Sequence, residues 1–272
     1  MGRIKERERV RRKARRKQLI VALIAAVAVA CGAGFLCFNY LISQQSVSSE
    51  TQVGRDRPKA LVADSLMLDF PNPELINYLV STLRSAGYDV DVVYGSDVNL
   101  TLYSRLTDYS LIILRIHGGK ATYKTPDGVI HKLNGLFTGV LWSDEYYKLK
   151  VEWLATRAFP YNSTKAFLAV LPKFFDVELK GRFKPDSVLI VASCYSLFTK
   201  DIADALGRRG LPIFIGWEGA VTLKHMDEAL KLLIDKVIKE NLTWAEAVKV
   251  VNEELGPDPV YGEELRIITY KH

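Results

Sequence analysis

The segment from residue 59 to residue 117 alternates between apolar extended stretches and helical patterns, and this alternation most constrains the fold. Between the extended stretches lie segments with helical spacing of apolar residues. The extended stretches are KALVAD (59–64), YDVDVVYG (88–95) and YSLIILRIH (109–117), and the helical ones are NPELINYLVSTLRSAG (72–87) and SDVNLTLYSRL (96–106). Such alternation is typical of a parallel sheet with helices on its faces.

The same rhythm returns after residue 185. The predicted elements are strands at 186–194, 211–219 and 264–270 and helices at 199–210, 224–240 and 243–255. Thr243 and Glu246 have the spacing of a capping box at the start of the last helix. We therefore predict a three-layer α/β domain over residues 59–272, with a mainly parallel six-stranded sheet.

Residues 118–180 interrupt the alternation. Residues 118–140 alternate in polarity around a Pro-Asp-Gly turn, which predicts a β-hairpin. Residues 141–180 have the least regular pattern; we expect a helix near 144–157 and an extended stretch at 164–172.

The twenty residues from 19 to 38 are apolar and span about 30 Å as a helix, the thickness of a bilayer core. Basic residues precede them, which predicts an N-terminus in the cytoplasm. We expect a basic cytoplasmic tail (1–18), a transmembrane signal-anchor helix (19–42), a flexible linker (43–58) and an extracytoplasmic domain held at the cell membrane by a single pass. A cleaved signal peptide is the alternative, although its apolar core is usually only about 7–15 residues long.

Net charge argues against a nucleic-acid partner. Of the formal charge of +6, the ten Lys/Arg and two Glu of residues 1–17 contribute +8, which leaves −2 for the rest of the chain. Cysteine content argues against disulfides, because Cys31 and Cys37 lie in the apolar segment and Cys194 is alone in the predicted domain.

His117 and Cys194 each stand at the carboxyl end of a predicted apolar strand, where functional crevices of parallel sheets lie. If these strands are neighbours, the imidazole of His117 can take the proton of the Cys194 thiol and later give it to a leaving amine. Gly118 and Gly119 leave room for a substrate carbonyl. We expect the amides of Gly118 and Cys194 to form the oxyanion hole.

The motifs LIILRIHGG (111–119) and SVLIVASCYSL (187–197) resemble the histidine-glycine and cysteine motifs of the caspase-like cysteine peptidases. The segments LPIFIGWEGAV and LTWAEAVKVVNEE are similar to the CHAT and gingipain branch of that superfamily. The resemblance implies a cysteine endopeptidase that acts on a peptide or protein substrate and needs no cofactor. The Gln-Ala-Cys motif of caspases is absent, and 77 positions separate His117 from Cys194, so a caspase preference for aspartate is not implied.

Three further residues are candidates at the same sheet edge. The resemblance implies that Glu218 could bind a basic substrate side chain, and Trp217 could form a pocket wall, while Asp64 could orient His117. The remaining histidines, His131, His225 and His272, are expected at the surface, and no ligand spacing indicates a metal site. Two alternatives remain open: a non-catalytic caspase-like binding module, and a flavodoxin-like domain that binds a small ligand.

Overall fold

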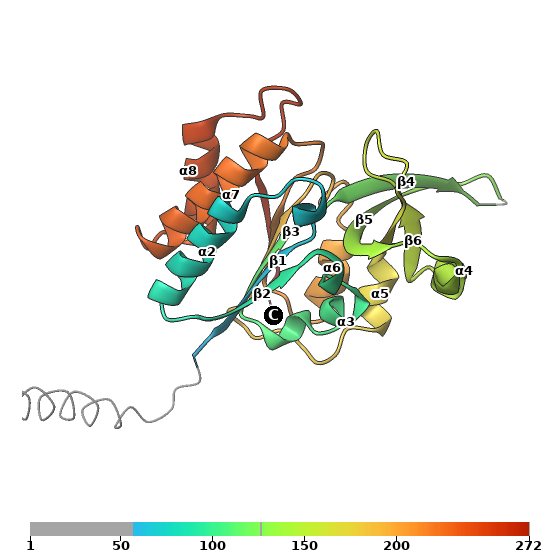
Figure 1. Ribbon diagram of the computed structural model, residues 1–272, viewed down its shortest axis with the longest axis horizontal. Helices are drawn as coiled ribbons and strands as arrows, with labels where there is room; N and C mark the ends of the chain where they lie inside the picture. The colour runs from blue at the N-terminus through green and yellow to red at the C-terminus, as the bar shows by residue number, and fades with distance from the viewer. Residues whose placement is uncertain (1–56, 126, 272) are drawn as a thin grey trace, which may run out of the picture. The chain divides into compact units, whose positions relative to one another are not determined.

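The computed structural model describes residues 57–125 and 127–271 (Figure 1). The predicted cytoplasmic tail, the predicted signal anchor 19–42 and almost all of the predicted linker lie outside these residues. Within the described ranges, no helix combines the length and the apolarity needed to cross a bilayer.

Six strands form the main sheet, in the order β10-β9-β8-β3-β1-β2. The strands are β1 (Lys59–Asp64), β2 (Asp89–Tyr94), β3 (Leu111–Arg115), β8 (Val188–Ala192), β9 (Ile213–Gly216) and β10 (Arg266–Thr269). All neighbours are parallel except β10, which runs antiparallel to β9. The predicted mainly parallel six-stranded sheet is therefore confirmed, and each predicted strand of the alternating segments is present.

Helices cover both faces of this sheet (Figure 1). One face carries α2 (Pro73–Ser85), α7 (Leu223–Ile238) and α8 (Trp244–Leu255), and the other carries α3 (Leu100–Tyr103), α5 (Pro172–Val177) and α6 (Asp201–Arg208). Strand β3 shows why both faces are apolar: Leu111 and Ile113 pack on the first face, whereas Ile112 and Leu114 pack on the second. The predicted capping box is also present at the start of α8.

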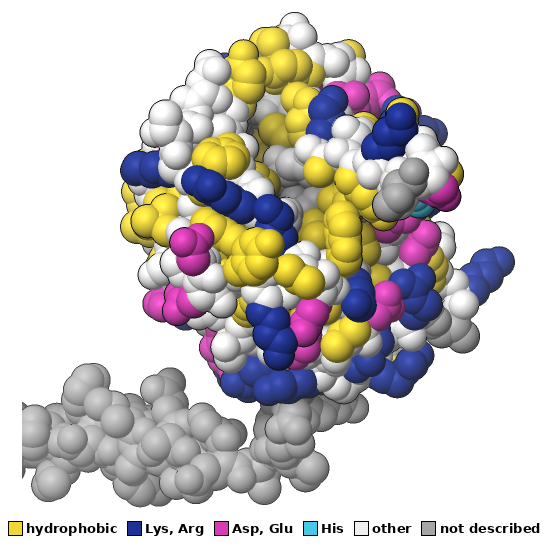
Figure 2. Space-filling view, turned by 90° about the vertical axis from the view of Figure 1, so that its right-hand side faces the viewer, with side chains coloured by type: hydrophobic (Ala, Val, Ile, Leu, Met, Phe, Trp, Pro, Cys, Tyr) yellow, Lys and Arg dark blue, Asp and Glu magenta, His cyan; other side chains and the backbone are white. Residues whose placement is uncertain are grey.

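A second, antiparallel sheet has the order β4-β5-β7-β6. Its strands are β4 (Gly118–Lys124), β5 (Ile130–Leu141), β6 (Ala155–Ala158) and β7 (Phe167–Val170), and the short helix α4 (Tyr147–Val151) joins β5 to β6. The hairpin predicted at 118–140 is thus confirmed as β4 and β5. Figure 2 looks at this side of the molecule, where apolar side chains surround a hollow.

Two local predictions are wrong. The helix expected near 144–157 ends at Val151, because Trp153 takes a left-handed backbone with φ of 62° and the chain then enters β6. His225 is buried rather than exposed, with only 8% of its surface accessible. The start of α7 is covered there, since Asp258 from the loop after α8 accepts hydrogen bonds from Thr222.

Candidate active site at the carboxyl ends of β3 and β8

The strands that end before His117 and Cys194 are hydrogen-bonded neighbours. Arg115 of β3 is in register with Ala192 of β8, and the Ile116 amide donates to the Ala192 carbonyl at 3.1 Å. The two strands, whose adjacency the sequence left open, are thus neighbours, and the backbones of His117 and Cys194 emerge at one edge of the sheet.

Gly118 brings the two chain segments into contact. A Cβ atom at this position would lie 2.1 Å from the Cys194 carbonyl oxygen and 2.6 Å from Ser193 Oγ, so a larger residue does not fit. The Phe137 amide donates to the His117 carbonyl, which makes the next pair along the ladder, Gly118 and Leu136, a non-hydrogen-bonded one. The Gly118 amide consequently points away from β5.

The His117 imidazole lies among three aromatic rings and one carboxylate. Its centroid is 6.1 Å from that of Phe70, 5.9 Å from that of Phe137 and 6.4 Å from that of Phe167. Its Nε2 atom is 3.5 Å from Asp69 Oδ2. Burial lowers the pKa of His117 below its usual value, and Asp69 opposes this shift only in part.

The Cys194 thiol has different partners. Its Sγ atom accepts a hydrogen bond from the Val221 amide at 3.4 Å and donates to the Val221 carbonyl at 3.5 Å. Burial raises the pKa of this thiol, so it is neutral at physiological pH. The structure thus brings the backbones of His117 and Cys194 to one edge but gives their side chains separate partners.

The turn that follows Cys194 has an unusual backbone. Tyr195 adopts φ of 58°, a left-handed conformation that bulky residues rarely take. The Tyr195 amide donates to the Gly219 carbonyl at 2.8 Å, which fixes this turn against the loop after β9. Nothing in the sequence pattern indicates such a conformation, because glycine is the usual residue there.

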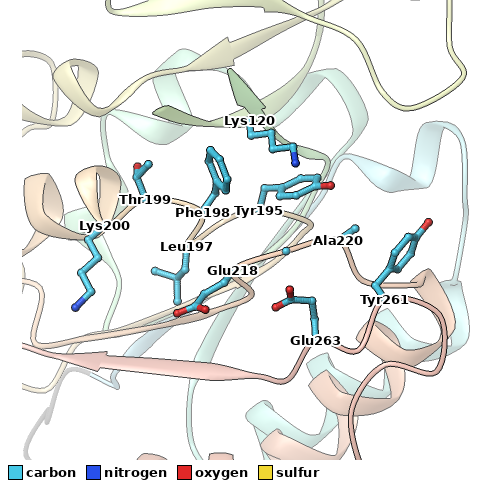
Figure 3. A pocket seen from close by; sticks show the side chains of 11 residues that line it. Lys120, Tyr195, Leu197, Phe198, Thr199, Lys200, Glu218, Ala220, Tyr261 and Glu263 are labelled. Atoms are coloured by element: carbon cyan, nitrogen blue, oxygen red, sulfur yellow. The ribbon is translucent and has the colours of Figure 1, made fainter. Parts of the chain in front are cut away.

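A cavity of about 660 Å³ opens beside this turn (Figure 3). Lys120 reaches over the Tyr195 ring, with its Nζ atom 4.6 Å from the ring centroid. Glu218 and Glu263 contribute carboxylates to the lining. Trp217 does not line the cavity: its side chain is fully buried in the core beneath α7 and α8.

Asp64 is occupied by an ion pair with Arg115 rather than placed beside His117. Arg115 Nη1 lies 3.1 Å from Asp64 Oδ1, and the other side of the guanidinium binds Asp227 of α7. Burial raises the pKa of Asp64, and Arg115 opposes that shift. The carboxylate next to the imidazole is that of Asp69, which the sequence pattern did not single out because it lies in an irregular loop.

Asp258 holds in place the loop between β9 and α7, which contacts the Cys194 thiol through Val221. One of its carboxylate oxygens accepts from the Thr222 amide at 2.8 Å and from Thr222 Oγ1 at 2.7 Å, and the other accepts from the amides of Val260 and Tyr261. Because Thr222 directly follows Val221, Asp258 fixes the backbone that contacts the Cys194 thiol. Long-range partners of this kind leave no mark in the sequence.

Comparison with known proteins adds no assignment: no protein-family model matches the chain, and no curated protein is significantly similar to it. In the described part of the chain, no group of three or more His, Cys, Asp or Glu side chains could hold a metal ion.

Proposed function

We propose that this chain is a membrane-anchored cysteine endopeptidase of the caspase-like class, with Cys194 as nucleophile and His117 as general base and acid. The observation that carries the proposal is the junction of β3 with β8. It places a histidine and a cysteine directly after two paired parallel strands, and Gly118 presses against the Cys194 carbonyl.

In the proposed reaction, His117 takes the thiol proton while Cys194 Sγ attacks the peptide carbonyl carbon. The amides of Gly118 and Cys194 stabilise the oxyanion, and the direction of the Gly118 amide, away from β5, suits this role. The C–N bond then breaks as His117 returns the proton to the leaving amine. Water attacks the remaining thioester and regenerates the thiol.

The strained backbone at Tyr195 supports the same assignment. A bulky residue with positive φ costs on the order of 1–3 kcal/mol, and such strain is concentrated at functional sites. It follows directly after the proposed nucleophile, where a fixed turn would present the thiol and the Cys194 amide to one substrate carbonyl.

For attack to occur, the thiol must leave Val221. The two hydrogen bonds to Val221 and the raised pKa describe a resting state in which Cys194 is protonated. These same contacts favour one rival function, a caspase-like binding module without catalysis. In that case Cys194 would remain a packed core residue.

We propose that the substrate occupies the cavity next to the Cys194 turn. Two carboxylates, Glu218 and Glu263, and two lysines, Lys120 and Lys200, line this cavity, so its charges balance. A basic substrate side chain would bind at Glu218, in line with what the family resemblance implies for this residue. The parallel strands in the order β2-β1-β3-β8-β9 also suit a flavodoxin-like ligand domain, whose switch point would lie between β1 and β3. That position is filled here by the buried Asp64–Arg115 pair.

The test uses the full chain in detergent micelles. Alkylation of Cys194 by iodoacetamide is followed by peptide mass spectrometry, and cleavage is assayed on a peptide library with basic and neutral members. We expect Cys194→Ala to abolish both signals and His117→Ala to slow both, whereas His131→Ala on the exposed hairpin leaves them unchanged. A folded protein whose Cys194 resists alkylation would exclude the peptidase and favour the binding module.

A further inference from the structure

We infer that Asp69 is the positioning residue for His117, holding its imidazole in the tautomer that leaves Nδ1 free to act as base. This inference rests on the proposed function for its catalytic meaning. The position of the Asp69 carboxylate beside His117 is a feature of the structure that no sequence motif indicated.

His117 Nε2 lacks a hydrogen-bond partner among the described residues. This nitrogen is buried, and no described residue has an atom placed to form a well-aligned hydrogen bond with it. Such a state is unusual for a buried polar atom. Asp69 Oδ2, at 3.5 Å, is the acidic oxygen that can satisfy it. Hydrogen bonds at catalytic sites are often long in an unliganded protein and shorten when substrate binds.

Three aromatic rings around the imidazole restrict it to this orientation. Phe70, Phe137 and Phe167 come from three separate segments and offer no hydrogen-bond acceptor in their side chains. The rings offer the imidazole no polar partner, whereas the Asp69 carboxylate lies next to its Nε2 atom. A proton on Nε2 that faces a carboxylate leaves the lone pair on Nδ1.

Backbone hydrogen bonds hold the segment that carries Asp69 in place. The Asp69 amide donates to the Leu66 carbonyl at 3.1 Å, and the Phe70 carbonyl accepts from Arg115 Nη1 at 3.1 Å. Arg115 itself is fixed by Asp64 and Asp227. The ion-paired core thus sets the position of the backbone on the C-terminal side of Asp69.

Charges around the imidazole act in opposite directions. Asp69 favours the protonated form of His117, whereas Arg115, close below, disfavours it. Lys165 approaches the other oxygen of Asp69 at 4.0 Å but is largely exposed, so solvent screens it. Asp69 is therefore the group whose removal changes His117 most directly.

The experiment is an NMR titration of histidine imidazoles in the full chain, in detergent micelles, with ¹³C,¹⁵N-labelled histidine. The chain has only four histidines, and His117→Gln assigns the signal of interest. We expect the Nε2–H tautomer in the unmodified protein. In Asp69→Asn we expect a lower pKa of His117 and a mixed tautomer, with Asp69→Glu restoring both in part and the exposed Asp144→Asn changing neither.

Alkylation of Cys194 by iodoacetamide and peptide cleavage complete the test. Asp69→Asn should reduce the His117-dependent part of the rate on the order of 10²-fold, mainly through kcat rather than KM. An imidazole with the same pKa and tautomer in Asp69→Asn overturns the inference, as does an unchanged rate in a protein whose alkylation depends on His117. If alkylation of the unmodified protein is independent of His117, the proposed function fails, and the NMR result alone decides whether Asp69 positions the imidazole.

Discussion

Arg115 of β3 and Asp227 of α7 form a bidentate ion pair inside the protein, with Nε 2.8 Å from Oδ1 and Nη2 2.9 Å from Oδ2. The guanidinium is completely buried and also binds Asp64. Three elements, β1, β3 and α7, are thereby joined directly beneath the strand end that carries His117.

Removal of Asp227 should destabilise the protein strongly, because it leaves the buried Nε and Nη2 groups of Arg115 without their acceptors, although Asp64 still offsets the charge. We expect Asp227→Ala to lower the free energy of unfolding by about 3–5 kcal/mol. Urea denaturation followed by tryptophan fluorescence measures it. Replacing an exposed partner, as in Asp108→Ala of the Arg105 pair, should change stability by less than about 1 kcal/mol. Equal losses for both variants would contradict the argument.

Gly118 should tolerate no side chain. The methyl group of Gly118→Ala would overlap the Cys194 carbonyl, so the two strand ends must separate. We expect a loss of about 1–3 kcal/mol in stability and a loss of Cys194-dependent cleavage. Gly135→Ala is the matched control, because its Cβ would meet its nearest atom at 3.5 Å, an ordinary contact. Thermal unfolding and peptide assays on both variants would distinguish them, and a fully active Gly118→Ala would be incompatible with this geometry.

Asp258→Asn should make the Cys194 thiol more reactive. It weakens the hydrogen bonds that fix Thr222, and the backbone of Val221 next to it is then freer to release Sγ. We expect faster alkylation of Cys194 together with a stability loss of about 1–3 kcal/mol. Because a general loss of structure would also expose the thiol, Leu83→Ala in α2 serves as an equally destabilised control. The prediction does not survive if both variants are alkylated at the same rate.

Acid should destabilise the protein partly through His117. Burial lowers the pKa of this imidazole in the folded state, so below about pH 6.5 the unfolded chain binds more protons than the folded one. The stabilisation is present above the unfolded pKa and is lost as the pH falls through the folded pKa. His117→Gln should therefore show a flatter dependence of unfolding free energy on pH between about pH 8 and pH 5. Urea titrations of the unmodified protein and of His117→Gln over that range measure the difference in their unfolding free energies. If the pKa of His117 were raised in the folded state, this difference would change with pH in the opposite direction.

The membrane predictions concern residues 1–56 and can be tested on cells. If residues 19–42 form a signal anchor with the N-terminus in the cytoplasm, protease added to intact cells should digest the domain that follows. A tag at the N-terminus should stay protected. Recovery of the domain in the soluble extracellular fraction would instead indicate the cleaved signal peptide, and protection of the domain would indicate the opposite orientation.

Regular apolar strands made the main sheet predictable from sequence. The continuous apolar runs before His117 and Cys194 indicated buried strands of a parallel sheet, and the structure shows that these strands are neighbours within it. The second sheet was only half predictable, because β6 and β7 have four residues each and lie within an irregular segment. Such short strands are specified by tertiary pairing more than by local pattern.

The contacts within the site could not be predicted for a related reason. Asp69 contacts His117 and Val221 contacts Cys194 from loops whose paths depend on the folded core, and Asp258 fixes the backbone next to Val221. Asp64 occupied the position expected of it at the end of β1, yet its carboxylate pairs with Arg115. A buried arginine on the next strand competes for that carboxylate, and the pattern of apolar residues contains no information about which partner prevails.

The hairpin of β4 and β5 leaves the main sheet without a hinge. Ile116 is tied to β8 by its amide, His117 is tied to β5 by its carbonyl, and β4 begins at the next residue. No loop residue separates His117 from β4, the strand that pairs with the twelve-residue strand β5. Any displacement of β4 therefore acts directly on the backbone of His117, because no loop residue lies between them.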